Sequence, residues 1–309
     1  MVLSLICPTK DATPWVAAIQ AIAPELDLRV WPDDDSKADI TFALVWAQPQ
    51  GIFAQYPNLG VISSMGAGVD NLLKDSSIPD PVAVVRIVDP RLVSQMGDYI
   101  LAAALNHVRQ FPGYGRQQQQ RRWQPRQPRN LEDVTVGVMG LGQIGSAVAI
   151  RLGQLGFQVV GWSRRPKSIA GVHTLADWPQ LADFLAASQV LVCLLPLTPE
   201  TENILNADTL GQLPPGAYVI NAARGQHLVE ADLLSLLDGN RLSGACLDVF
   251  RQEPLPLDHP FWTHPKIRVT PHIASLTDPG SVAPQIVDNY QRLAAGQPLL
   301  NQVNRQRGY

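Results

Sequence analysis

Three short stretches in the second half of the chain carry side chains suited to proton transfer beside a carboxylate. The stretch "NAARG" contains Arg224, "LDVFRQEPLP" contains Glu253, and "TPHIAS" contains His272. An imidazolium donates a proton near neutral pH, a neighbouring carboxylate favours that charged form, and a guanidinium fork binds carboxylates. Each residue alone also fits an ordinary role, as a surface charge, a turn residue before Pro254 or a core histidine. Their combination predicts general acid catalysis on a small carboxylate substrate.

These stretches need a sheet that brings them together. Each follows a predicted strand, and open α/β sheets bind ligands at the carboxyl ends of their strands. The stretch "VTVGVMGLGQIG" adds a strand that runs into a glycine-rich loop and then a predicted helix. Gly140 permits the tight turn, Gly142 lets the backbone approach a pyrophosphate, and Gly145 lets helix and strand pack closely. With Gln143 and Ile144 at the helix N-terminus, this pattern predicts a dinucleotide-binding loop.

The strand after this loop ends in "WSRRPK", which bears on the choice of dinucleotide. NAD-binding loops are followed about 20 residues later by an Asp or Glu for the adenosine ribose. Ser163, Arg164 and Arg165 stand there instead. A carboxylate repels a 2′-phosphate, whereas Ser and Arg donate hydrogen bonds to phosphate oxygens. We therefore predict NADP(H) as the cofactor. The alternative is that Arg164 and Arg165 are only a solvated pair of surface charges.

Apolar runs alternate with helical segments along nearly the whole chain. They are "VLSLIC", "LRVW", "ITFALVW", "GVISSM" and "VAVVRIV" in the first part, then "VTVGVM", "FQVVGW", "VLVCLL", "AYVINA", "GACLDV" and "IRVTP". Strands separated by helices form parallel βαβ units, and continuous apolar strands are typical of sheets covered on both faces. The predicted fold class is α/β, with two Rossmann-like or flavodoxin-like domains built on parallel sheets. Thr13 is expected to cap the first helix, with Pro14 at its first position.

The segment "GRQQQQRRWQPRQPRN" interrupts this alternation. It lacks apolar periodicity over most of its length, so we expect an exposed arm. Its five arginines do not predict nucleic-acid binding, because the chain carries a net charge of −3. Trp123 needs an apolar environment, which a partner subunit would offer, and a homodimer is therefore expected.

Composition narrows the class of protein further. At 309 residues the chain has room for two domains, and 46% of it is hydrophobic. No apolar run reaches membrane-spanning length, and "MVLSLICP" resembles a buried strand more than a signal peptide. Cys7, Cys193 and Cys246 are expected to be reduced, buried thiols in a cytoplasmic protein. No metal-ligand spacing is found among the histidines and cysteines.

Taken together, the motifs resemble the D-2-hydroxyacid dehydrogenase family over nearly the whole chain. The similar stretches are "SMGAGVD", "GLGQIG", "WSRRPK", "LLPLTPET", "NAARG", "LDVFRQEPLP", "TPHIAS" and "NQVNRQRGY". The resemblance implies reduction of small 2-keto acids, with Arg224, Glu253 and His272 as the catalytic set. It also implies a substrate domain made of 1–97 plus 277–309, with a cofactor domain of 98–276 inserted in it. Because the ribose-binding acid is absent, the NADP-using branch matches.

The resemblance assigns further residues. Asp248 would bind the nicotinamide carboxamide, and Trp46 would lie by the substrate, although a core role suits this tryptophan equally. The remaining cofactor positions are Leu195, Pro196 and Ala222, and the remaining substrate positions are Met65, Gly66, Ala67, Gly68 and Ser275. Glycines 66 and 68 would let backbone N–H groups face an anion, unless "SMGAGVD" is only a turn after a strand.

Two alternatives stay open at this stage. One is a dehydrogenase of the same family acting on other or larger 2-keto acids. The other is a nucleotide-sensing corepressor with the same fold, which we disfavour because no interaction tail follows the predicted fold. Small-molecule 2-keto or 2-hydroxy acids are the expected partners, with neither nucleic acid nor membrane.

Overall fold

The computed structural model describes residues 1–305. The chain forms two compact units. Unit 1 comprises Met1–Leu92 together with the chain from Thr277 onward, and unit 2 comprises Val93–Leu276. Unit 2 is thus an insertion within unit 1. The first division falls after Leu92, and the sequence predicted it after residue 97; both positions lie inside helix α3 (Pro90–Val108).

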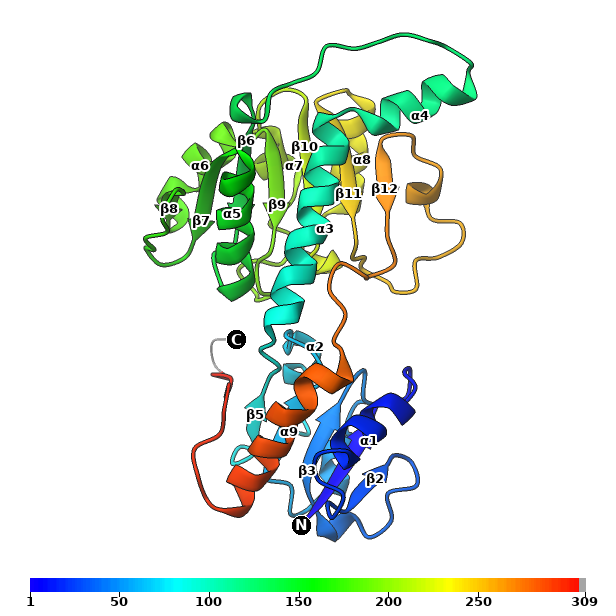
Figure 1. Cartoon of the computed structure of the whole chain (residues 1–309), viewed down its shortest axis with the longest axis vertical. Coiled ribbons are helices and arrows are strands. Elements are labelled where there is room, and N and C mark those ends of the chain that lie inside the picture. Colours follow the sequence, from blue (N-terminus) through cyan, green and yellow to red (C-terminus); the bar gives the residue numbers. More distant parts are fainter. Residues whose placement is uncertain (306–309) are drawn as a thin grey trace. The chain divides into compact units, whose positions relative to one another are not determined.

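Unit 1 is built on a five-stranded parallel sheet in the order β2-β1-β3-β4-β5. This is the order of flavodoxin-like folds. Alternate side chains of each strand face opposite sides: Leu3 and Leu5 pack with α1 and α9, and Val2 and Ile6 pack on the other face. The strands are β1 (Val2–Ile6), β2 (Leu28–Val30), β3 (Ile40–Val45), β4 (Val61–Ser64) and β5 (Ala83–Val85), and the helices are α1 (Thr13–Gln20), α2 (Asp70–Leu73) and α9 (Pro279–Ala294) (Figure 1).

Unit 2 is built on a seven-stranded parallel sheet in the order β12-β11-β10-β9-β6-β7-β8. Counted from β6, the first six strands have the Rossmann order, and β12 extends it. Besides α3, its helices are α4 (Phe111–Gln119), α5 (Gln143–Leu155), α6 (Leu181–Ala187), α7 (Ala207–Gly211) and α8 (Glu230–Asp238). The strands are β6 (Thr135–Met139), β7 (Gln158–Ser163), β8 (His173–Ala176), β9 (Val190–Cys193), β10 (Ala217–Asn221), β11 (Leu242–Leu247) and β12 (Ile267–Val269).

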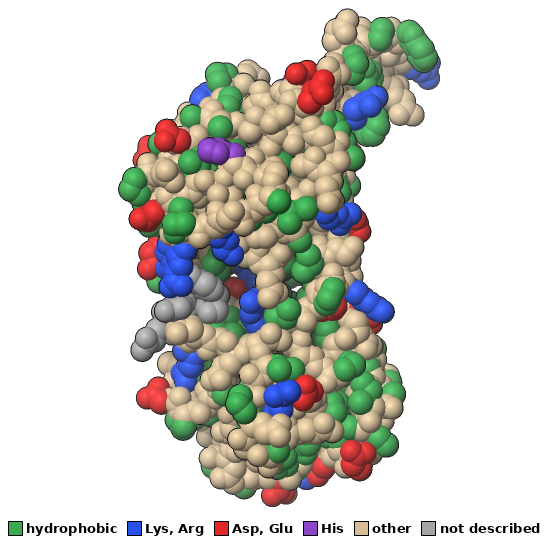
Figure 2. All heavy atoms as spheres, turned by 60° about the vertical axis from the view of Figure 1, so that its left-hand side comes forward, with side chains coloured by type: hydrophobic (Ala, Val, Ile, Leu, Met, Phe, Trp, Pro, Cys, Tyr) green, Lys and Arg blue, Asp and Glu red, His purple; other side chains and the backbone are tan. Residues whose placement is uncertain are grey.

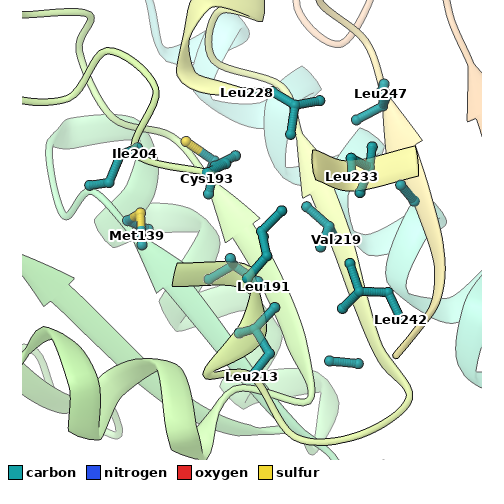
Figure 3. Packing of buried hydrophobic residues seen from close by; sticks show 14 of the residues in the cluster. Met139, Leu191, Cys193, Ile204, Leu213, Val219, Leu228, Leu233, Leu242 and Leu247 are labelled. Atoms are coloured by element: carbon teal, nitrogen blue, oxygen red, sulfur yellow. The ribbon is translucent and has the colours of Figure 1, made fainter. Parts of the chain in front are cut away.

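The seven-stranded sheet is buried on both faces. One face packs against α3 and α5 through residues such as Val136 and Val192, and the other packs against α6, α7 and α8 through Leu191 and Val219 (Figure 3). Fully buried strands explain why the apolar runs are nearly continuous. The prediction of an α/β fold with two parallel sheets is therefore confirmed.

One local expectation was wrong. Thr13 does not cap α1: Asp11 accepts a hydrogen bond from the Thr13 N–H at 2.9 Å, and Ala12 precedes the helix without a side-chain cap.

The predicted arm begins as a helix, because Gly115–Gln119 belongs to α4, whose first turn contains Pro112. Glutamine and arginine are good helix formers, so this segment is helical without an apolar stripe.

Beyond α4 the arm is irregular and exposed. Residues 121–130 are all exposed, and the side chain of Trp123 is 99% exposed. The arm projects from unit 2 in Figure 1, and Figure 2 shows hydrophobic and basic side chains side by side on this projection. Among residues 1–305, no helix has both the length and the apolar character needed to cross a membrane.

Candidate active site

The strand register of unit 2 brings the predicted site residues to one edge. Met139 pairs with Trp162 and with Cys193, and Asn221 pairs with Cys193 and with Leu247. Strands whose last residues are paired end at the same level, so the segments that follow them gather at one side of the sheet. We call this side the carboxyl edge; the segments there begin at Gly140, Arg164, Leu194, Ala222, Asp248 and Thr270.

The glycine-rich loop occupies the middle of the carboxyl edge. Gly140 has a φ of +105°, and a Cβ on it would lie 2.7 Å from the Leu194 carbonyl oxygen. A Cβ on Gly145 would lie 1.8 Å from the Gly140 carbonyl oxygen, so helix α5 can pack this closely only with glycine there. A Cβ on Gly142 would meet nothing within 4 Å. The side of the loop at Gly142 is therefore open, as a bound pyrophosphate requires.

Helix α5 begins at Gln143, directly after this loop, and Ile144 is its second residue. The Ser146 N–H bonds to the Gly142 carbonyl as the first turn closes. The preceding N–H groups of a helix have no partner within the helix, and they carry the positive end of its dipole. The loop and the helix terminus therefore fit a dinucleotide phosphate.

The turn after β7 presents two exposed cations. The side chains of Arg164 and Arg165 are exposed, whereas Ser163 is buried and donates its hydroxyl hydrogen to the Arg165 carbonyl at 2.8 Å. The single proton of Ser163 is thus used within the turn. The Thr198 hydroxyl foremost, and Arg164 more weakly, lower the pKa of Glu200, which places Arg164 near the loop that follows β9. The turn thus presents two guanidinium groups of the kind that the expected 2′-phosphate requires.

The turn that carries Arg224 is held by close backbone contact. A Cβ on Gly225 would lie 1.9 Å from the Phe250 carbonyl carbon, so only glycine lets the two segments approach so closely. Asn221 is fully buried, and its side-chain N–H donates to the Arg224 carbonyl at 2.9 Å. The backbone of Arg224 is extended, with φ −142°. These contacts bring the base of the Arg224 side chain next to the segment that contains Glu253.

The buried carboxylate of Asp248 organises the segment that follows β12. Its Oδ1 accepts from the Thr270 hydroxyl at 2.6 Å and from the Ile273 N–H at 2.9 Å, and its Oδ2 accepts from the Ala274 N–H at 2.8 Å. The Asp248 carbonyl also accepts from the His272 N–H at 2.8 Å. Asp248 is 1% exposed. One residue at the end of β11 therefore fixes the backbone on both sides of His272.

Glu253 and His272 form a pair at the carboxyl edge, in the segments that follow β11 and β12. His272 Nδ1 lies 2.7 Å from Glu253 Oε2, and Glu253 Oε1 accepts from the Phe250 N–H at 2.9 Å. Burial acts to raise the pKa of the Glu253 carboxyl, but the hydrogen bonds and the nearby charges of His272 and Arg224 outweigh it, so this pKa lies below its usual value. The Glu253 carboxylate therefore stays ionised at neutral pH and can accept from His272.

His272 adopts an uncommon backbone conformation. Its φ is +55°, in the left-handed region, which few residues other than glycine and asparagine enter without cost. The contacts to Asp248 hold the segment in place on either side. Residues kept in such conformations occur at functional sites, where the surrounding structure compensates for the strain. Here the conformation aims the imidazole ring at Glu253.

In unit 1 the remaining predicted substrate residues also follow strand ends. Trp46 follows β3, and the loop of Met65, Gly66, Ala67 and Gly68 follows β4. A Cβ on Gly66 would lie 3.0 Å from the Trp46 ring, so this glycine makes room for the indole; its φ is not positive. The Ser64 hydroxyl accepts from the Gly66 N–H and donates to the Gly68 carbonyl, which orders the loop.

Three residues that contact the predicted site residues were not predicted from the sequence. Lys10 Nζ lies 3.6 Å from the centre of the Trp46 ring, a cation–π contact. His227 is fully buried; its Nδ1 accepts from the Arg224 N–H, and its Nε2 lies 3.3 Å from the Pro196 carbonyl. Asn221 is the third. Only their position could have indicated a role in the site, because Asn221 and His227 lie on either side of "AARG" at the end of a strand.

The other predicted cofactor and substrate positions line the same edge of unit 2. Leu195 and Ala222 are buried, Pro196 is exposed, and Ser275 is half-buried in the segment after Ala274. Such a doubly wound sheet with a glycine-rich loop at its carboxyl edge defines a dinucleotide-binding protein.

Comparison with known proteins identifies the family within this class of dinucleotide-binding proteins. Residues 101–274 match the model of the D-isomer specific 2-hydroxyacid dehydrogenase NAD binding domain. The chain is 40% identical over 308 residues to a glyoxylate/hydroxypyruvate reductase A of Yersinia enterocolitica, and 42% identical to that of Serratia proteamaculans. Each alignment covers 98% of both chains. The chain belongs to the D-isomer specific 2-hydroxyacid dehydrogenase family.

Two solved structures support this assignment. A D-isomer specific 2-hydroxyacid dehydrogenase from Xanthobacter autotrophicus, in complex with NADPH and MES, is 42% identical with a TM-score of 0.95, covering 100% of this chain and 99% of that one. An NADPH-dependent glyoxylate/hydroxypyruvate reductase from Sinorhizobium meliloti, in complex with NADP and sulfate, is 35% identical with a TM-score of 0.93, covering 99% of each chain.

The Asp248 contacts lead to a prediction about stability. In the Asp248→Asn variant, an amide NH2 replaces one acceptor oxygen and faces a backbone or hydroxyl donor. We expect a loss of about 1–3 kcal/mol, which lowers the thermal midpoint of unfolding by about 2–12 °C. Differential scanning calorimetry of the protein without cofactor measures this midpoint. Asp232→Asn is the matched control, because Asp232 accepts one N–H, from Ala207 at 2.8 Å, which an amide oxygen also accepts. Equal midpoints for the two variants would contradict the prediction.

Proposed function

We propose that this chain is an NADPH-dependent reductase of small 2-keto acids. Glyoxylate and hydroxypyruvate are the first substrates, reduced to glycolate and D-glycerate. The observation that carries the proposal is the 2.7 Å contact between His272 Nδ1 and Glu253 Oε2, at the edge that also carries the glycine-rich loop. The activities after which the Yersinia, Serratia and Sinorhizobium relatives are named support it.

In this proposal His272 is the general acid. When bound, the reduced nicotinamide supplies a hydride to the carbonyl carbon. Because Glu253 accepts from Nδ1, that nitrogen keeps its proton in both charge states of the ring, and Nε2 is the atom that donates a proton to the keto oxygen. The ionised Glu253 stabilises the imidazolium before transfer and orients the neutral ring after it. The product is a hydroxyl group, and His272 regains its proton from solvent.

Arg224 binds the substrate carboxylate in this scheme. Its planar guanidinium presents parallel donors that match both carboxylate oxygens, which a lysine ammonium does not. From the family resemblance, we assign the backbone N–H groups of the Met65–Gly68 loop and the Trp46 indole to substrate binding as well. Lys10 beside that indole favours a small polar substituent on the substrate over a large apolar one.

The cofactor would be held by the chain in three places. The glycine-rich loop and the first turn of α5 bind the pyrophosphate. Arg164 and Arg165 bind the 2′-phosphate of the adenosine ribose. A carboxylate accepts up to about four hydrogen bonds, so Asp248 Oδ2, which accepts from Ala274, has capacity left for the nicotinamide carboxamide.

We further propose a cytoplasmic homodimer. Cys7, Cys193 and Cys246 are free and buried, which suits a reducing compartment. An indole that is 99% exposed on a projecting arm favours burial against a second copy. In that dimer the arm of one subunit would place Trp123 against its partner.

The cofactor assignment predicts a strong preference for NADPH. Hydrogen bonds to charged groups contribute about 1.5–3 kcal/mol each, less where exposed, so two arginines favour NADPH over NADH by about ten- to a thousandfold in kcat/KM. The variant Arg164→Gln/Arg165→Gln should lose most of this ratio through a higher KM for NADPH. A control, Arg109→Gln/Arg121→Gln, removes the same charge elsewhere and should retain it. An unchanged ratio in the first variant would overturn the assignment.

The general acid assignment predicts a large loss of turnover in His272→Asn. Asparagine tolerates the left-handed backbone, so the loop should keep its shape while the proton donor is lost. We expect kcat for glyoxylate reduction to fall by about 10²- to 10⁴-fold, with the dissociation constant of NADPH nearly unchanged. Steady-state kinetics and fluorescence titration measure the two quantities. Full turnover in this variant would place the proton donor elsewhere.

Glu253→Gln supplies a companion measurement. Glutamine keeps one acceptor oxygen but not the negative charge beside His272, so kcat for glyoxylate reduction should fall by about tenfold or more while the dissociation constant of NADPH stays nearly unchanged. An unchanged kcat would mean that the Glu253 carboxylate takes no part in the reaction.

A substrate comparison tests the proposed function as a whole. The purified protein is assayed with NADPH and glyoxylate, hydroxypyruvate, pyruvate or phenylpyruvate. We expect the highest kcat/KM for glyoxylate or hydroxypyruvate, because the Trp46 indole, in the role proposed for it, limits the space beyond the keto carbon. A higher value for phenylpyruvate would favour a dehydrogenase of larger 2-keto acids. No NADPH oxidation with any of the four would refute the proposed function.

A further inference from the structure

A second cluster of ionisable side chains lies at the opposite edge of the unit 2 sheet. A cavity of about 330 Å³ is lined by the C-terminal end of α3, the beginning of α4, the returning arm, and the first residues of β10, β11 and β12. These strand beginnings define the amino edge, whereas every predicted catalytic and cofactor residue follows a strand end. The cavity is therefore separate from the candidate active site.

Its lining is rich in positive charge. Five side chains, from the arm and from the start of β12, are cationic, and the lining contains no aspartate or glutamate. The whole chain has a net charge of −3, so this concentration is local. The five are Arg116, Arg126, Arg129, Lys266 and Arg268.

The hydrogen-bond partners found for these cations are neutral. Arg116 donates to the Pro265 carbonyl at 3.3 Å, Arg126 to the Gln110 side-chain oxygen at 3.2 Å, and Lys266 to the Asn240 side-chain oxygen at 2.7 Å. Within residues 1–305, no carboxylate lies within ion-pair distance of any of the five. Like charges that repel one another without a counter-charge are costly, and an anion in the cavity would relieve that cost.

The interior wall of the cavity is aromatic. The rings of His107 and Tyr218 stack with their centres 4.1 Å apart and their planes at 15°. Burial, together with the charge of Arg129, lowers the pKa of His107 to about 4, so this ring is neutral at physiological pH. The positive charge therefore lies on the guanidinium and ammonium groups around the opening, and the neutral ring pair forms the wall.

We propose that this cavity binds a compact small molecule with at least two anionic groups, either phosphates or carboxylates. Its volume is at the small end of the roughly 300–1,000 Å³ typical of ligand sites. Guanidinium forks pair with both kinds of oxyanion, and several of them around one opening select for more than one anionic group. The site takes no part in the proposed reduction, so the two proposals can fail independently.

Isothermal titration calorimetry on NADPH-saturated protein tests the proposal. Saturation with NADPH keeps the probes away from Arg164 and Arg165, and 150 mM salt screens weak attraction to the surface. Inorganic pyrophosphate and citrate are the probes, and acetate is the monoanion control. We expect one site per chain for pyrophosphate, citrate or both, and none for acetate. Binding of only one probe identifies the phosphate or carboxylate class. No heat with either probe at millimolar concentration would overturn the proposal.

Two matched variants locate the site. Arg126→Gln/Arg129→Gln removes two lining charges and should weaken probe binding by about tenfold or more. Arg121→Gln/Arg122→Gln removes two charges from the same arm outside the lining and should leave binding unchanged. An equal effect of both variants would mean diffuse attraction to the arm, and would overturn the proposal.

Light scattering tests the alternative that an acidic segment of a second copy of this chain occupies the cavity. The molar mass of Arg126→Gln/Arg129→Gln should equal that of the wild type if the cavity serves a small molecule. A lower mass, accompanied by wild-type protein that binds neither probe, would show that the cavity is an interface between copies.

Discussion

The carboxyl edge of unit 2 depends on one buried carboxylate. Asp248 accepts from the Thr270 hydroxyl and from two backbone N–H groups beyond His272, while its own carbonyl accepts from the His272 N–H. Strand β12 has three residues, and the segment after it has no regular structure of its own. Without this carboxylate, the segment that holds His272 at φ +55° would lose three of its hydrogen bonds. The position of the proposed proton donor is thus determined from the end of the neighbouring strand.

Sequence patterns predicted most of this architecture because its signals are local. Helix α5 was expected to begin at Gln143 and spans Gln143–Leu155, since Gly142 precedes it and Gly156, with φ +110°, ends it. Continuous apolar runs predicted strands buried on both faces. Helix α4 was not predicted, because Gln-rich and Arg-rich sequence forms a helix without an apolar stripe when the first turn contains a proline.

The site was predictable in its residue types but not in its contacts. Arg224, Glu253 and His272 stand out because charged residues at strand ends have few structural reasons to be there. The backbone contact at Gly225 joins segments 25 residues apart, from Gly225 to Phe250, and no spacing rule predicts it. The hydroxyl of Ser163 was expected to serve a ligand and is used inside its turn. The contact at Gly225 follows from tertiary packing, which a local pattern does not contain, and the Ser163 hydrogen bond depends on the detailed geometry of its turn.

Charged groups are arranged differently at the two edges of the same sheet. At the carboxyl edge the ionised groups have partners: Glu253 contacts His272, and Asp248 accepts three hydrogen bonds through its carboxylate. These pairings orient the groups, and orientation is what proton transfer requires. At the amino edge, five cations surround a cavity whose lining holds no carboxylate. Paired charges are suited to directing a reaction, whereas unpaired charges of one sign are suited to attracting a ligand of the other sign. The same fold can thus carry a catalytic site and a separate anion site without either disturbing the other.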